Sequence, residues 1–356
     1  MITPPSAEAR TEAYVRLAAL AKPTGALGHL EHLAAWVTSC QGFCPPRTLD
    51  RVRAVILAGD HGVSEPSDSG PGVSAYPREV TPAMVRAFVA GRAAANVLAR
   101  QHGVTLRVLD LAVDADLSDL GEVGAYKIRR SSGAIDTADA LSPDECARAL
   151  AAGAEIAATE IAEGADLLIL GDMGIGNTTP ATALIAATFG VPAAEVVGRG
   201  TGVDDERLRH KITIITAALN RVQDRAADPV ARLTALGSAD LAAGVGFLLE
   251  AARRGVPVLL DGIISVAEAA VAEDLEPGVI AWCAAGHRST EPAQQLALDK
   301  LGLNQSTLDQ STLSPVLNLG LRLGEGTGAL AALPVLRSAV LLLREMALLA
   351  DLAPAH

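Results

Sequence analysis

Residues 166–189, DLLILGDMGIGNTTPATALIAATF, contain the pattern that decides the fold. A short apolar run leads into Gly171-Asp172, a loop rich in glycine, asparagine and threonine follows, and an apolar segment then extends to about Phe189. An apolar run without alternating polar residues is typical of a strand buried on both faces. Thr178 or Thr179 is a candidate cap for the next helix, and Pro180 suits its first turn. The segment predicts a strand, a ligand-facing loop and a helix.

Similar apolar runs recur along the chain, and each ends in aspartate, glycine or histidine. They lie at 52–58, 104–109, 256–260 and, more weakly, 279–283. Strands that alternate with helices indicate right-handed crossovers and a parallel sheet. We therefore expect an α/β fold with a doubly wound, Rossmann-like parallel sheet and a smaller helical domain. Ligands of such sheets bind beyond the carboxyl ends of the strands.

The two ends of the chain differ from this middle part. Residues 7–40 have leucines at roughly helical spacing around a turn at 22–25. The apolar stretch 329–350 is interrupted by Pro334 and by charged residues, so we expect buried helices there and no membrane span. The expected division is a parallel α/β domain over 49–319 with the active site, and a helical domain built from 1–48 and 320–356.

Composition excludes several classes of protein. Lysine and arginine number 29 against 41 acidic residues, a net charge of −12, and no basic run is interleaved with aromatic residues, so nucleic acid is not an expected partner. Cys40, Cys44, Cys146 and Cys283 have neither zinc-site spacing nor a nearby histidine cluster. Four reduced thiols and no signal-peptide pattern predict a cytoplasmic protein without a metal site.

Two glycine-rich loops are candidates for binding an anion. In 171–180, Gly174 and Gly176 allow the backbone to approach a ligand closely, although the spacing matches neither the Walker nor the dinucleotide motif. Asp172 is unusual in a loop that only binds phosphate. The second loop, 197–202, precedes a polar helix whose cations include Lys211; that helix face is either part of a phosphate site or merely solvated.

Glu325 lies between glycines in GLRLGEGTGA, residues 320–329, just before a long apolar helix. A carboxyl group in such surroundings is expected to be partly desolvated, with a raised pKa and greater basicity. A helix-terminal charge that interacts with the dipole is an equally good interpretation on physical grounds alone. Asp60-His61-Gly62, at the end of the first run, is too small a set for a metal site.

Taken together, these motifs resemble the nicotinate-nucleotide–dimethylbenzimidazole phosphoribosyltransferase family. The similarity covers nearly the whole chain in the order of the family's motifs, and it is most specific at 173–180 and 322–328. The other similar segments are 22–28, 58–63, 72–77 and 260–262.

The resemblance implies a homodimer that uses no cofactor. The reaction that the resemblance implies moves ribose phosphate from nicotinate mononucleotide to 5,6-dimethylbenzimidazole and releases nicotinate, in assembly of the lower loop of cobalamin. Glu325 corresponds to the general base, and Asp172 stands where the family often has glutamate. The substrate-binding residues that it implies are Tyr76, Met84 and Leu323 at the base, Gly174, Gly176, Asn177, Thr178, Gly200, Thr201, Gly202 and Lys211 near the phosphate, and Asp261, Gly262 and Ser289.

The chemistry of the implied reaction agrees with these residues. The pyridinium of the donor is already an activated leaving group, so neither an acid nor a metal is required to expel it. A single inverting displacement leaves one ring proton to remove, for which Glu325 is the candidate acceptor. Two alternatives remain open: a non-catalytic nucleotide sensor on the same scaffold, and a transferase that uses another base such as adenine or a phenol.

Overall fold

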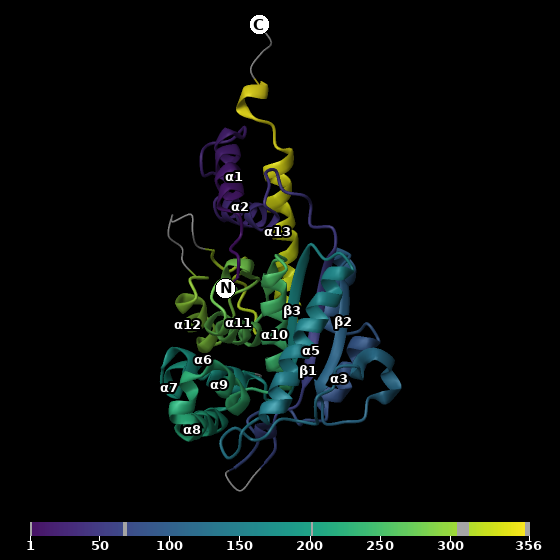
Figure 1. The fold of residues 1–356 in the computed structure, drawn as a ribbon, viewed down its shortest axis with the longest axis vertical. Helices are drawn as coiled ribbons and strands as arrows, with labels where there is room; N and C mark the ends of the chain where they lie inside the picture. The colour runs from purple at the N-terminus through teal and green to yellow at the C-terminus, as the bar shows by residue number, and fades with distance from the viewer. Residues whose placement is uncertain (1, 67–69, 201, 305–312, 353–356) are drawn as a thin grey trace.

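The computed structural model describes residues 2–66, 70–200, 202–304 and 313–352 (Figure 1). Its centre is a five-stranded, all-parallel sheet in the order β2-β1-β3-β4-β5. The strands are β1 (Val52–Gly59), β2 (Thr105–Ala112), β3 (Leu167–Met173), β4 (Val258–Leu260) and β5 (Cys283–Ala285). The predicted doubly wound parallel sheet is confirmed.

The end of the sheet differs from the sequence-based expectation in one respect. The run 279–283 predicted a strand, but Ile280–Trp282 form a 3-10 helix, and β5 begins only at Cys283. The indole N–H of Trp282 donates to the carbonyl of Thr3, which ties this turn to the N-terminal segment. The strand is therefore displaced along the chain toward His287.

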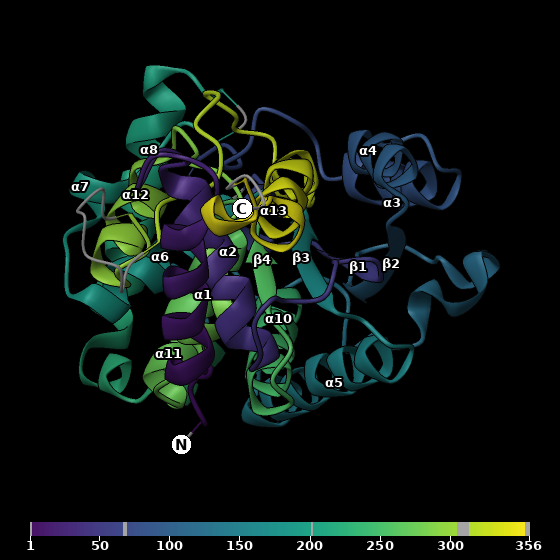
Figure 2. The ribbon, with the colours of Figure 1, turned by 90° about the horizontal axis from the view of Figure 1, so that it is seen from above.

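Helices cover both faces of the sheet (Figure 2). On one face lie α3 (Val80–Val89), α4 (Ala94–His102) and the first half of α13 (Thr327–Glu345). On the other face lie α5 (Pro143–Ala162), α10 (Ala239–Arg253) and α11 (Ile263–Leu275). Between β3 and α10 the chain forms α6 (Thr178–Phe189), α7 (Ala193–Val196), α8 (Asp205–Val222) and α9 (Pro229–Leu236). After β5 it forms α12 (Pro292–Lys300).

Local sequence explains where these helices begin. Ser142 and Glu145 form a reciprocal capping box at the start of α5, and Pro143 occupies its first position. The predicted cap of α6 is wrong, because the helix begins at Thr178 itself and Asn177 before it makes no side-chain cap bond. The Asn177 side chain is used elsewhere, in the pocket described below.

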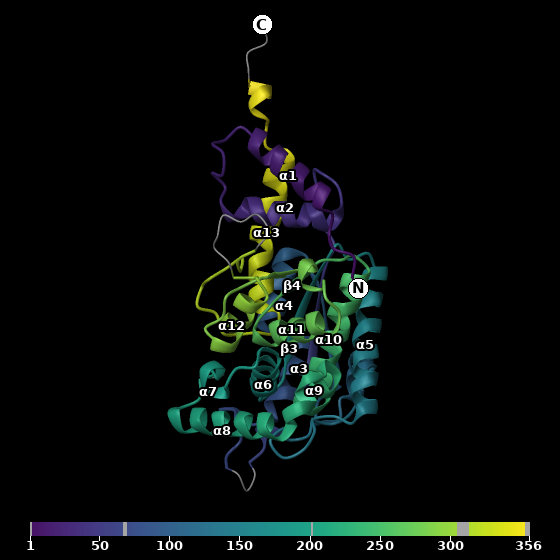
Figure 3. The same ribbon diagram turned by 60° about the vertical axis from the view of Figure 1, so that its left-hand side comes forward.

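The N- and C-terminal helices pack together at one end of the molecule (Figure 3). Here α1 (Ala7–Ala19) and α2 (His29–Gln41) contact α13, whose other end reaches the sheet beside β3. By length and mean hydropathy, 1.4, α13 has the properties of a membrane span, but half of that stretch is buried within the protein. A buried core helix has the same properties, so the observation is weak support for a span.

Candidate active site

A cavity of about 560 Å³ opens beyond the carboxyl ends of the strands. Its lining residues come from four segments, 76–94, 171–178, 261–265 and 322–325. Gly200, His287, Ser289 and Glu291 complete the lining. Its volume is within the range of small-molecule sites. β1 and β3 are neighbours in the sheet but have β2 between them in sequence, so the cavity also lies at the switch point where such sheets bind ligands.

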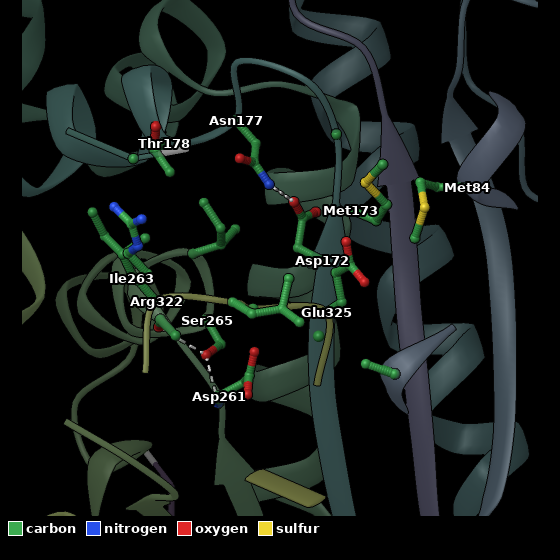
Figure 4. A pocket seen from close by; sticks show the side chains of 18 of the residues that line it. Met84, Asp172, Met173, Asn177, Thr178, Asp261, Ile263, Ser265, Arg322 and Glu325 are labelled. Atoms are coloured by element: carbon green, nitrogen blue, oxygen red, sulfur yellow. Dashed lines mark hydrogen bonds between the residues drawn. The ribbon is translucent and has the colours of Figure 1, made fainter. Parts of the chain in front are cut away.

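One wall of the cavity is apolar and comes largely from α3. Val80, Met84 and Ala87 follow one another at the spacing of a single helix face. Met173 lies on the same side of the pocket as Met84 (Figure 4). Tyr76, which is 54% exposed, stands at the rim. Polarisable thioether and alkyl groups of this kind suit a flat aromatic ring.

The loop after β3 forms a polar wall that can receive an anion. The N–H of Ile175 donates to Thr81 Oγ1 (3.1 Å), that of Asn177 to the carbonyl of Gly174, and that of Thr179 to the carbonyl of Gly176. Within the described chain, the N–H groups of Gly176 and Thr178 are left without a protein acceptor. They lie at the N-terminus of α6, where the helix dipole favours negative charge.

A buried lysine supports this loop from behind. Lys211 on α8 is only 2% exposed, and its Nζ donates to Thr178 Oγ1 and to the carbonyl of Gly198, both at 3.2 Å. Burial lowers the pKa of Lys211 to about 8, and the nearby charge of Glu291 acts in the opposite direction. Glu291 also accepts a hydrogen bond from the N–H of Gly200 at 2.9 Å. The solvated-helix interpretation is therefore wrong for Lys211.

Glu325 reaches the cavity from a strained turn. Its φ of +62° is a left-handed conformation that a non-glycine residue rarely adopts. The turn lies directly on β3, where a Cβ added at Gly171 would be 2.5 Å from the N of Gly326 and 2.9 Å from the carbonyl carbon of Glu325. Burial, and then the charge of Asp261, raise the pKa of Glu325 from 4.5 to about 7. A group with this pKa is suited to accept a proton near neutral pH.

Asp261 holds this turn in place. Its two carboxylate oxygens accept the N–H groups of Gly326 and Ala329, both at 3.0 Å, and His287 Nε2 lies 3.7 Å from Oδ1. These bonds satisfy N–H groups at the start of α13. Both carboxylate oxygens of Asp261 therefore hold the turn that carries Glu325. The Asp261 side chain also borders the cavity.

Asp172 faces Glu325 in the centre of the pocket (Figure 4). Asn177 Nδ2 donates to Asp172 Oδ1 at 2.7 Å, a bond that explains why Asn177 does not cap α6. Burial, followed by the charges of Asp240 and Glu268, raises the pKa of Asp172 well above its usual value. Arg322 lies toward the other end: a Cβ added at Gly202 would be 3.6 Å from its guanidinium.

The structure brings most of the predicted site residues around one cavity. Those that line it are Tyr76, Met84, Asp172, Gly174, Asn177, Thr178, Gly200, Asp261, Gly262, Ser289, Leu323 and Glu325. Lys211 supports the wall from outside, Gly176 and Gly202 do not line the cavity, and Thr201 is outside the described residues.

Sequence reasoning missed several lining residues, among them Val80, Ala87, Met173 and Ser265. The helical spacing of Val80 and Ala87 from Met84 was a usable signal for these two.

In the described part of the chain, no group of three or more histidine, cysteine, aspartate or glutamate residues is arranged to hold a metal ion.

Comparison with known proteins agrees with this architecture. A family model described as Phosphoribosyltransferase matches residues 2–352. A Mycobacterium marinum protein named nicotinate-nucleotide–dimethylbenzimidazole phosphoribosyltransferase is 53% identical over 351 residues, which are 98% of this chain and 93% of the relative. A Mycobacterium tuberculosis protein of the same name is 52% identical over 347 residues, 97% and 91% of the two chains. The crystal structure of CobT from Thermus thermophilus superposes with a TM-score of 0.89 at 41% identity, covering 98% of this chain and all of the other.

Proposed function

This chain belongs to the nicotinate-nucleotide–dimethylbenzimidazole phosphoribosyltransferase family, and we propose how its pocket performs that transfer. The enzyme moves the phosphoribosyl group of nicotinate mononucleotide to 5,6-dimethylbenzimidazole in cobalamin lower-ligand assembly. The observation that carries our assignment of roles is that one cavity joins an anion-binding end to an apolar wall, with Glu325 and Asp172 between them.

The donor binds with its phosphate at the loop after β3. The N–H group of Thr178 on the cavity wall, at the N-terminus of α6, and the positive charge of Lys211 behind that wall supply the complementary charge. Lys211 is buried and held by two hydrogen bonds, so its position is fixed before the donor arrives. Gly200 and Ser289 border the same region and contact the ribose phosphate. This end therefore determines where ribose C1 lies.

The accepting base stacks on the apolar wall of α3. Met84, Met173 and Leu323 hold the ring system, and Tyr76 covers the rim. One ring nitrogen attacks C1 as the bond from C1 to the pyridinium nitrogen breaks. Nicotinate departs with the electron pair of that bond, so it needs no proton. Attack on the face opposite the leaving group converts the β-linked donor into an α-linked product, α-ribazole 5′-phosphate.

The second ring nitrogen of the base then carries an excess proton, which Glu325 accepts. A positioned general base contributes on the order of 10²–10⁴-fold to the rate. The raised pKa of Glu325, about 7, makes it a stronger base than a solvated glutamate while it remains substantially ionised near neutral pH. Asp172 acts beside it as an orienting group.

We also propose a homodimeric, cytoplasmic enzyme in which 1–48 and 320–356 form a helical domain beside the α/β domain of 49–319. In support, α1, α2 and α13 pack together, and Val15, Leu341, Leu349 and Leu352 leave exposed apolar side chains at that end. Four free thiols suit a reducing compartment. Light scattering on the purified protein measures the assembly directly, and a monomer at working concentrations contradicts the dimer.

A product assay tests the proposed function. Purified protein is incubated with nicotinate mononucleotide and, separately, 5,6-dimethylbenzimidazole, adenine and a phenol, and products are identified by mass and by the NMR signature of the anomeric centre. We expect α-ribazole 5′-phosphate and stoichiometric nicotinate from the benzimidazole. Binding of the donor without turnover of any base supports the sensor alternative, and turnover of adenine or phenol alone reassigns the accepting base.

A further inference from the structure

Four ionisable side chains meet where Asp172 borders the pocket, and only Asp172 has a place in the mechanism above. Asp172 comes from the end of β3, His61 follows β1, Asp240 lies in the first turn of α10, and Glu268 lies on α11. All four are at most 4% exposed. We call them the buried acid cluster.

The backbone around the buried acid cluster is shaped to admit these groups. A Cβ added at Gly59 would be 2.6 Å from the carboxyl carbon of Asp240, and one at Gly244 would be 2.1 Å from that of Glu268. A Cβ at Gly174 would be 3.0 Å from His61 Nε2. Side chains at these three positions would displace the cluster, so the polar groups occupy space that the fold keeps open for them.

Hydrogen-bond donors inside the buried acid cluster are too few for three carboxylate anions. Asp172 Oδ1 accepts from Asn177, and His61 Nε2 lies 3.4 Å from Asp240 Oδ2. Among the described residues, Asp172 Oδ2 and both oxygens of Asp240 and of Glu268 make no hydrogen bond. A buried carboxylate without donors or a counter-charge is strongly disfavoured, whereas a protonated carboxyl can donate to a neighbouring oxygen.

The charges around the cluster favour Asp240 as the ionised member. Burial would raise its pKa, but the charge of His61, whose Nε2 lies 3.4 Å from Asp240 Oδ2, and then the polar groups of His61 and Ser238 hold that pKa below its usual value. The charge of Asp240 in turn adds to burial in raising the pKa of Asp172 and of Glu268. Asp60, which accepts the N–H of Asp114 at 2.8 Å, is a further acidic group near His61 and Asp240.

We propose that Asp172 is a neutral carboxylic acid in the working enzyme, which accepts from Asn177 through Oδ1 and directs the proton on Oδ2 toward Asp240. Asp240, held by His61, is the positioning residue that keeps Asp172 in this state, and Glu268 is itself protonated. The centre of the pocket then presents Glu325 as the proton acceptor and Asp172 as a neutral orienting group. A neutral Asp172 also avoids repelling the phosphate and carboxylate of the donor, which an anion at this point would do.

Infrared spectroscopy tests the protonation state without any reference to activity. Spectra are recorded above the pKa of Glu325, which is about 7, so that Glu325 contributes little to the carbonyl stretch of protonated carboxyl groups. We expect that band in the wild type, a loss of intensity in both Asp172→Asn and Glu268→Gln, and no loss in the control Glu325→Gln. Absence of the band in the wild type, or an unchanged band in Asp172→Asn, overturns the proposal.

Kinetics give a second readout, which rests on the proposed function. Asparagine reproduces both hydrogen bonds of a protonated Asp172, so Asp172→Asn should keep kcat/KM within about threefold, whereas Asp172→Ala loses roughly tenfold, as expected for one or two hydrogen bonds. Equal losses in the two variants mean that Asp172 works as an anion. If no base is turned over at all, the proposed function fails while the spectra still decide the protonation of Asp172.

Asp240→Asn tests the positioning role. Loss of the Asp240 charge should lower the pKa of Asp172, so the carboxyl band assigned to Asp172 should disappear at a lower pH than in the wild type. A titration of the Asp172 band that is unchanged in Asp240→Asn refutes the role of Asp240.

If Asp240→Asn does not fold, Glu268→Gln is the second variant. It removes the infrared band of the Glu268 carboxyl group and should leave the pH profile of kcat/KM unchanged. An altered profile argues against a protonated Glu268.

Discussion

Replacement of Glu325 by glutamine is the most direct perturbation of the proposed chemistry. Glutamine keeps the size of the side chain and removes its basicity. The turn itself should persist, because the hydrogen bonds that hold it run from the N–H groups of Gly326 and Ala329 to Asp261 and do not involve the Glu325 side chain. The change therefore isolates proton transfer from loop geometry.

The magnitude of the loss follows from the environment of Glu325. A pKa raised from 4.5 to about 7 means that the folded protein increases its proton affinity by roughly 3 kcal/mol relative to a glutamate in water. Glutamine forfeits the whole of this acceptor function. We expect kcat to fall on the order of a hundredfold or more, within the range of general-base contributions, while the KM for nicotinate mononucleotide changes little.

The assay is a pH profile of kcat/KM for the wild type and Glu325→Gln. Because the ionised form is the base and its pKa is about 7, wild-type activity should be present above that pH and fall about tenfold per unit below it. The pH profile of Glu325→Gln should lose this fall in activity at low pH. Any pH dependence that remains there arises from titration of the substrates. Glu155→Gln, an exposed change on α5, is the matched control. Near-full turnover with an unchanged profile in Glu325→Gln refutes the assignment of the base.

Three further changes probe the rest of the pocket. Lys211→Ala should raise the KM for nicotinate mononucleotide far more than that for the base, and the wild-type KM for this donor should rise above about pH 8, where the ammonium of Lys211 is lost; equal effects on both substrates argue for a structural role. Asp261→Asn should lower kcat and shift the acid limb to lower pH, because the charge that helps to raise the pKa of Glu325 is removed; a limb that stays near 7 contradicts that coupling. Gly171→Ala should lower both kcat and the melting temperature, since the added Cβ would press on the turn at Gly326; an alanine variant with wild-type kcat shows that this contact is easily relieved. Activity should also survive treatment with EDTA, and loss that magnesium restores would rule out direct displacement as written.

The strands were predictable from sequence wherever tertiary context added nothing to the local pattern. The runs that became β1, β2 and β3 are largely apolar, as a sheet covered on both faces requires. The run at 279–283 predicted a strand that begins too early, because a 3-10 turn precedes β5. Trp282 anchors that turn to the N-terminal segment. That bond joins residues 279 positions apart, which no local pattern reports.

The candidate site was predictable where a residue type was unusual for its surroundings. Glu325 between glycines and Asp172 after a strand are such cases, and both lie in the cavity. Asp240 and Glu268 carried the same signal, since each is a single acid within an apolar segment, but nothing in sequence placed them beneath Asp172. The role of Asp261 was hidden because it acts through the backbone N–H of Gly326, 65 residues away.

The position of α13 has a mechanical consequence. The helix begins just after Glu325, runs past β3 and ends among α1 and α2, so one continuous helix, with Pro334 inside it, joins the proton acceptor to the terminal helices. We expect that loosening of those helices weakens the packing of α13 and relaxes the strained turn at its other end before the sheet itself unfolds. Thermal inactivation of the enzyme should then follow the melting of the terminal helices and precede the loss of the central sheet.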